Sequence, residues 1–109
     1  MSRNFSQMIT VRSDAPERII ELLEEWDRHQ ATSDVMGYMG TRFLADREDP
    51  GRYVILAEFG VVDPDVPAAD EAARNNDRPE TRAWLAKFRE VIEGEPEYHD
   101  FDELYRTDF

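Results

Sequence analysis

A four-residue signal for the start of a helix, Asp-x-Pro-Glu, occurs twice in this chain, at positions 14–17 and 77–80. An Asp at the N-cap with a Glu three residues later resembles a capping box, and both carboxylates complement the helix dipole. Proline is tolerated in the first turn because the N–H group that it lacks has no partner there. The two signals therefore predict two helices at corresponding points of the two halves of the chain.

Apolar residues recur at helical spacing after both signals. They are Ile19, Ile20, Leu23 and Trp26 after the first signal, and Trp84, Leu85, Phe88, Val91 and Ile92 after the second. This spacing predicts a first helix at about residues 15–30 and a second helix that ends before Gly94. Gly94 suits the C′ position, and Pro96 blocks continuation of the helix. A further short helix is expected over residues 68–74, interrupted by Asn75 and Asn76.

Four other segments alternate with the period of a β-strand. They are Phe5–Arg12, Tyr38–Ala45, Tyr53–Phe59 and, near the end of the chain, Tyr98–Tyr105. The first contains consecutive β-branched residues, which favour strands. Asp49-Pro50-Gly51 is strong turn chemistry between the second and third segments, so these two form a predicted hairpin.

The resulting order is β-α-β-β-α-β in a chain of 109 residues, the length of a single domain over residues 1–109. A pattern with one helix after the first strand and another after the third is typical of the ferredoxin-like split βαβ fold. Both crossovers should be right-handed, which places both helices on one face of an antiparallel sheet. We therefore predict an α+β ferredoxin-like domain.

The other face of such a sheet needs a polar surface or a cover. The second and third strands carry large apolar groups on both sides, for example Met39 and Phe43 against Tyr38 and Leu44. A half-exposed antiparallel sheet should alternate more cleanly. An apolar face of this size favours association, and twofold symmetry is the commonest solution. We predict a homodimer, with a monomer that has an amphipathic second face as the alternative.

Composition excludes several classes of function. The net charge is −12, which repels nucleic-acid backbones and anionic lipid surfaces. There is no cysteine, so thiolate metal sites and cysteine nucleophiles are excluded, and the two histidines show no metal-ligand spacing. No secretion signal and no membrane-spanning apolar run is recognisable. We expect a cytoplasmic protein with no nucleic-acid or membrane partner.

Four stretches together resemble the antibiotic biosynthesis monooxygenase (ABM) type of the dimeric α+β barrel superfamily. They are FSQMITVR, GYMGTRFLADREDPGRYVILAEF, ARNNDRPETRAWLAKF and PEYHDFD, which cover nearly the whole chain. The resemblance implies a homodimer whose sheets form a barrel, with a ligand pocket between each sheet and its helices. It also implies one of three kinds of protein: a cofactor-independent monooxygenase for an aromatic polyketide or quinol, a haem-degrading enzyme, or a family member without an assigned activity.

The haem-degrading branch of that superfamily uses an Asn on the first strand, a Trp, and a His on the second helical segment. Asn4 matches the first position and Trp84 is available for the second, but no His occurs between Gln30 and Tyr98. The resemblance therefore disfavours haem degradation, and we expect no cofactor.

Several residues are candidates for chemistry. His99 exchanges protons near neutral pH and is the candidate base, although a histidine on the surface of an acidic strand is the simpler interpretation. Asn75 or Asn76 offers an amide to a substrate carbonyl or enolate, against an ordinary role in turn formation. Arg42 could neutralise an anionic ligand or pair with an acid at an interface. His29 is explained by the dipole of its helix.

Trp84 and Phe88 fit either the core or the apolar floor of a pocket for a small aromatic ligand. Two hypotheses follow. In the first, the protein is a cofactor-independent oxygenase, or a related enzyme for small aromatic substrates. In the second, it is a non-catalytic dimeric binding or interaction module on the same scaffold, because a fold alone does not determine a function.

Overall fold

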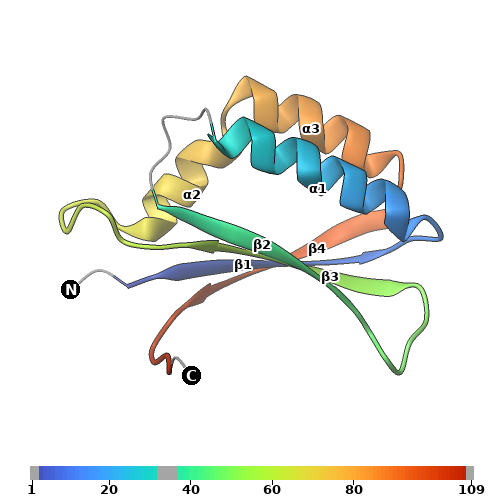
Figure 1. The fold of residues 1–109 in the computed structure, drawn as a ribbon, viewed down its shortest axis with the longest axis horizontal. Helices are drawn as coiled ribbons and strands as arrows, with labels where there is room; N and C mark the ends of the chain where they lie inside the picture. The colour runs from blue at the N-terminus through green and yellow to red at the C-terminus, as the bar shows by residue number, and fades with distance from the viewer. Residues whose placement is uncertain (1–2, 32–36, 108–109) are drawn as a thin grey trace.

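The computed structural model describes residues 3–31 and 37–107 and shows one four-stranded sheet with helices on one side (Figure 1). The elements are β1 (Phe5–Arg12), α1 (Pro16–Ala31), β2 (Tyr38–Ala45), β3 (Arg52–Phe59), α2 (Ala68–Asn76), α3 (Pro79–Arg89) and β4 (Glu93–Asp102). The strands lie in the order β2-β3-β1-β4, and every neighbouring pair is antiparallel. The predicted ferredoxin-like α+β fold is therefore confirmed. Over the described part of the chain, no helix combines the length and apolar character that crossing a membrane requires.

Strand pairing assigns each side chain of the central strand β1 to one face. Phe5, Ile9 and Val11 are buried beneath the helices. Ile9 stands opposite Ile55 on β3 and opposite Tyr98 on β4. The side chains at the even-numbered positions of β1 point to the sheet face without helices, which we call the open face. The alternation predicted for β1 thus separates a core side from an open side.

Aromatic contacts join the helices to this core. Trp84 and Phe88 of α3 are stacked with ring centroids 5.0 Å apart, and Phe88 is fully buried. Trp84 also lies 5.3 Å from the ring of Trp26 on α1. Ile19 on α1 is fully buried in the same cluster. The helical faces predicted from apolar spacing are therefore the faces that pack on the sheet.

The helix starts differ from the predicted capping by Asp. At the start of α1, the side-chain hydrogen bond to the backbone comes from the buried Ser13. Its Oγ accepts from the N–H of Ala15 at 3.0 Å and donates to the carbonyl of Val91 at 2.6 Å. At α3 the N-cap is Arg78, which makes no side-chain cap bond, so the capping role predicted for Asp77 is wrong. The sequence gives no local signal for this role of Ser13, because Val91 is 78 residues away.

Helix α3 also ends earlier in the sequence than the apolar spacing predicts. The helix ends at Arg89, and Gly94 and Pro96 belong to β4. Gly94 has φ of 68°, and the register of β4 shifts against β1 between Thr10 and Arg12. A bulge and a proline are tolerated here because β4 is an edge strand. Similarly, α2 continues through Asn75 and Asn76, so the predicted interruption falls two residues later.

A second register shift reverses the predicted orientation of one aromatic residue. The pairing of β2 with β3 shifts between Tyr38 and Gly40. Tyr38 stands opposite the buried Phe59, with ring centroids 5.6 Å apart, and therefore lies on the same side as Phe43. Strict alternation placed Tyr38 and Phe43 on opposite faces. A bulge adds one residue, which changes the face of every residue before it.

The buried stack predicts a large loss of stability in Phe88→Ala. Removing a fully buried aromatic ring leaves a cavity between α3 and the sheet and typically costs about 3–5 kcal/mol of unfolding free energy. Urea unfolding followed by circular dichroism measures this loss. The exposed residue Arg89 on the same helix provides a matched control, because Arg89→Ala should change stability by less than about 0.5 kcal/mol. Equal stability of both variants would contradict the assignment of Phe88 to the core.

Candidate functional site

A cavity of about 300 Å³ lies between the sheet and its helices. Its apolar wall comes from β1, β3, α1 and α3. This wall consists of Ile9, Leu23, Trp26, Ile55, Ala57, Phe59, Trp84 and Leu85. Such a volume, enclosed mostly by apolar and aromatic side chains, is typical of a site for a small organic ligand.

Six polar or partly polar side chains interrupt the apolar wall. They are Gln7, Thr41, Asn75, Asn76, Thr81 and Tyr98. Asn75, Asn76 and Thr81 gather where α2 ends and α3 begins, so the cavity has one polar end built on a helix junction. A few convergent polar groups in an apolar pocket are what fixes the orientation of a ligand.

Asn75 is the most deeply buried of these polar residues, with 1% of its surface exposed. Its Oδ1 accepts a hydrogen bond of 3.0 Å from Nε2 of Gln30, and its backbone carbonyl accepts one of 2.7 Å from Oγ1 of Thr81. Its Nδ2 has no hydrogen-bond partner within the described part of the chain. Leaving a buried donor unpaired costs about 1–3 kcal/mol, so Asn75 keeps an unpaired N–H at a cost in stability.

The two tryptophans are held in fixed positions beside this amide. Nε1 of Trp84 donates to the carbonyl of Leu22 at 2.6 Å, which ties α3 to α1. Trp84 stacks on Phe88 on one side and meets Trp26 on the other. A planar aromatic ligand would find offset or edge contacts with such rings favourable. The indole N–H of Trp84, however, is already used by the backbone.

Tyr98 is the only side chain of the described cavity wall that titrates in water. Burial raises its pKa above 10.0, although the charge of Arg89 opposes this effect. The phenol therefore stays protonated near neutral pH and acts as a hydrogen-bond donor or acceptor. The wall described here includes no carboxylate and no imidazole.

The structure brings only part of the predicted site together. Asn75, Asn76 and Trp84 line the cavity, while Phe88 lies behind Trp84 in the core. His99 stands on the open face, because it pairs with Met8 while its neighbour Tyr98 pairs with Ile9. The geometry thus gives no support to His99 as a base for a ligand in this cavity.

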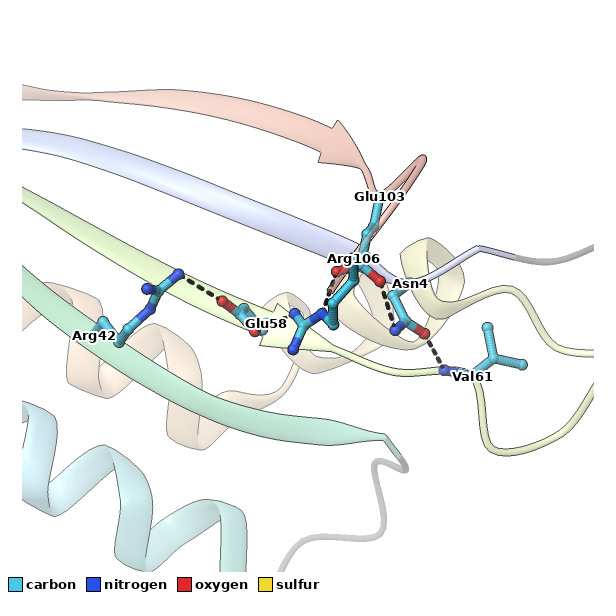
Figure 2. Close-up of polar contacts among 6 residues, drawn as sticks. All are labelled: Asn4, Arg42, Glu58, Val61, Glu103 and Arg106. Carbon is cyan, nitrogen blue, oxygen red and sulfur yellow. Dashed lines mark hydrogen bonds and ion pairs between the residues drawn. The ribbon is translucent and has the colours of Figure 1, made fainter. Parts of the chain in front are cut away.

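Arg42 is also on the open face, at the opposite edge of the sheet. It shares one row across the strands with Leu56, Met8 and His99. Its guanidinium pairs with Glu58 at 2.9 Å, and Glu58 also binds Arg106 of the C-terminal segment at 3.0 Å (Figure 2). Arg42 therefore does not reach the cavity, and its observed partner is an acid of the same chain.

Asn4 and His29 have local structural partners. Oδ1 of Asn4 accepts from the N–H of Val61 at 3.1 Å, and its Nδ2 donates to Glu103 at 2.9 Å (Figure 2). His29 lies 3.6 Å from Glu25 one turn earlier on α1. Asn4 thus ties the start of β1 to the loop after β3 and to the C-terminal segment.

Sequence reasoning missed Gln30, Gln7, Thr81 and Tyr98. Gln7 could have been found, because it is the one polar residue on the core side of β1, between Phe5 and Ile9. Gln30 follows the helical spacing of Leu23 and Trp26, but it lies at the end of α1, where a polar residue is unremarkable. Among the residues that the structure describes, no group of three potential ligands could hold a metal ion.

Comparison with known proteins places this arrangement in context. No protein-family model matches the sequence, and no curated protein sequence matches it significantly. Solved structures match over nearly the full length. SnoaB, a cofactor-independent oxygenase from Streptomyces nogalater, has a TM-score of 0.72 and 15% identity, with 97% of each chain covered. The chain has the fold of antibiotic biosynthesis monooxygenase-like proteins.

Two further solved structures share this fold, and the first of them carries the family name. A protein from Nitrosomonas europaea, named as a candidate antibiotic biosynthesis monooxygenase, has a TM-score of 0.69 and 15% identity over 99% of this chain and 97% of its own. Rv0793 from Mycobacterium tuberculosis has a TM-score of 0.69 and 11% identity, covering 96% and 99%. The ABM-type resemblance read from the sequence is therefore confirmed at the level of the fold.

Tyr38 beside the cavity predicts a loss of stability in alkali. Its hydroxyl contacts Thr41, a cavity residue, and donates to Asp27 at 2.9 Å. Burial raises the pKa of Tyr38 from 10.0 to about 12. Between these values the unfolded chain loses the proton while the folded chain keeps it, so its stabilising effect is complete below pH 10 and is lost as the pH rises towards 12.

Urea unfolding at about pH 8 and about pH 11 should therefore show a smaller pH-dependent loss in Tyr38→Phe than in the unmodified protein. The exposed Tyr105, 83% accessible, supplies the matched control, because Tyr105→Phe should keep the full loss. An identical loss in all three proteins would contradict the role of Tyr38.

Proposed function

We propose that this protein is a cofactor-independent monooxygenase that acts on an electron-rich aromatic substrate of the quinol or anthrone kind. One observation carries the proposal: the buried amide of Asn75 keeps an unpaired N–H at the polar end of a cavity walled by Trp26 and Trp84. An N–H group held in an apolar site stabilises an oxyanion more strongly than water-exposed donors do. The fold similarity to SnoaB, described as a cofactor-independent oxygenase, supports the same class.

The reaction balances without a separate reductant. An anthrone-type substrate is an activated CH₂ next to aromatic rings, and it loses a proton to give an enolate whose negative charge rests on oxygen. The enolate transfers electrons to O₂, and the new C–O bond forms at the former CH₂ carbon. That carbon becomes a carbonyl, the second oxygen atom leaves as water, and the four electrons come from the substrate.

The protein's contribution is binding, orientation and stabilisation of the enolate. Asn75 donates its Nδ2 hydrogen to the enolate oxygen, and the tryptophans hold the ring system. The described wall supplies no carboxylate or imidazole base. Water therefore takes the proton. The substrate must be acidic enough for this step, and the hydrogen bond from Asn75 increases its acidity. This requirement restricts substrates to those that form a stabilised enolate or phenolate.

Asn75→Leu should remove most of the turnover while preserving the fold. Leucine has a similar volume and no donor, and loss of one oxyanion donor typically lowers kcat by about 10²–10³-fold. Oxygen consumption with a panel of anthrones and hydroquinones measures turnover, and thermal unfolding checks the fold. Unchanged turnover in a folded Asn75→Leu protein would contradict the proposed role of the amide.

His99→Ala tests the base that the sequence suggested. Its position on the open face leads us to expect turnover within about twofold of the unmodified protein, because no contact with the reacting atoms is lost. Abolished turnover in a folded His99→Ala protein would instead support the sequence-based role and would require a different site for the chemistry.

The absence of an internal base in the described wall also favours a second candidate function, a non-catalytic module that binds a small aromatic ligand. Such a module would bind anthrone-type ligands without consuming oxygen. Quenching of Trp26 and Trp84 fluorescence measures ligand binding. Together with the oxygen measurement, it distinguishes the two functions.

We also propose that the protein forms a homodimer through the open face. Leu44 and Phe101 lie on this face and are each about half exposed, although they are large and apolar. Arg42, Glu58 and Arg106 form a chain of ion pairs at one end of the sheet (Figure 2). A second copy would cover the apolar side chains, and the paired charges would tolerate burial better than isolated ones.

Phe101→Asp should convert the dimer into a monomer, because it places a charge in the apolar part of the contact. Sizing with light scattering should give about twice 12.8 kDa for the unmodified protein and 12.8 kDa for this variant. Glu95→Gln, an exposed change on the same edge strand, serves as a control that stays dimeric. A 12.8 kDa unmodified protein would rule out the dimer.

A further inference from the structure

We propose that Gln30 determines which end of the Asn75 amide faces the cavity, and thereby selects ligands that present an oxyanion or carbonyl oxygen. This inference rests on the proposed function, since it assigns a positioning residue to the same site. Gln30 is 9% exposed and lies on α1, whereas Asn75 lies on α2. The two amides therefore meet across a helix contact and not within one turn.

The geometry of the pair leaves two complementary atoms unused. Nε2 of Gln30 donates to Oδ1 of Asn75 at 3.0 Å. Oε1 of Gln30 and Nδ2 of Asn75 have no partner among residues 3–31 and 37–107. Each primary amide carries both donors and an acceptor. The single hydrogen bond between the two side-chain amides thus uses the oxygen of Asn75 and leaves its nitrogen without a partner.

Asn75 cannot rotate freely, because its backbone is also fixed. Thr81 donates to its carbonyl at 2.7 Å, and Thr81 is buried at the start of α3. The side chain is therefore held at one end by its own backbone and at its oxygen by Gln30. Of the Asn75 amide, the atom without a partner in the described part of the chain is Nδ2, which can only donate.

The chemical selectivity follows from this polarity. A ligand group beside Asn75 must accept a hydrogen bond, so a carbonyl, enolate or phenolate oxygen fits. A neutral hydroxyl oxygen also accepts, but it forms a weaker hydrogen bond than an ionised oxygen does. Gln30 does not line the cavity, so it acts through Asn75 and is not a catalytic residue. Without Gln30 the amide of Asn75 could turn over and present Oδ1 to the cavity instead.

A chromophoric phenol reports this polarity directly. The probe is 4-nitrophenol, whose neutral and ionised forms absorb at different wavelengths. Bound to the unmodified protein, it should ionise at lower pH than in water, because Nδ2 of Asn75 stabilises the phenolate. Gln30→Met removes the amide at nearly constant volume, and we expect at least half of this downward shift to disappear. Arg28→Met, an exposed change on the same helix, should keep the whole shift.

Gln30→Glu provides a second variant, because an ionised carboxylate only accepts. It should take the N–H of Asn75 for itself and move the ionisation of the bound phenol above its value in water. Thermal unfolding identifies any variant that fails to fold. A folded Gln30→Met or Gln30→Glu protein with the unmodified shift overturns the role of Gln30.

The two measurements separate the monooxygenase function from the positioning role of Gln30. If the unmodified protein binds and ionises the phenol but consumes no oxygen with anthrones, the monooxygenase function fails and the positioning role of Gln30 stands. If it oxidises anthrones while Gln30→Met keeps the full shift, the positioning role fails and the function stands. If the unmodified protein binds no phenol at all, the positioning role fails, and oxygen consumption with anthrones alone decides the function.

Discussion

The antiparallel pairing of β1 with both β3 and β4 is the constraint on which the rest of the molecule depends. Because β1 is central, its register fixes the face of its own residues and of both neighbouring strands. Ile9 and Tyr98 consequently lie on the helix side, while Met8 and His99 lie on the open side. A shift of one residue would exchange these two sets and would move Tyr98 away from the cavity.

Most of the architecture could be predicted because it follows from the local spacing of apolar residues. The bounds of β1 and β2 agree with the predicted ranges, and the apolar stripe of α3 packs as expected. The errors occur where long-range pairing modifies a local pattern. Tyr38 changes face at a bulge, and Gly94 enters an edge strand although a glycine in that position is typical of a helix end.

The candidate site was less predictable, for a related reason. Asn75 was selected because amides suit enolates, and it lines the cavity; His99 was selected because histidine titrates near neutral pH, and it lies outside. Residue type gives the chemistry of a side chain but not its side of the sheet. Gln30 was invisible to sequence reasoning, because its importance depends on a contact with a residue 45 positions later.

The location of Asn75 has a consequence for dynamics. It stands in the last turn of α2, a helix of nine residues, and its carbonyl closes the junction to α3 through Thr81. Short helices open locally more readily than a central strand does. A ligand that occupies the Asn75 N–H binds only the closed junction and therefore stabilises it by mass action. Ligand affinity and the local stability of this junction are thus one linked equilibrium, and sequence changes far from the cavity can tune binding through it.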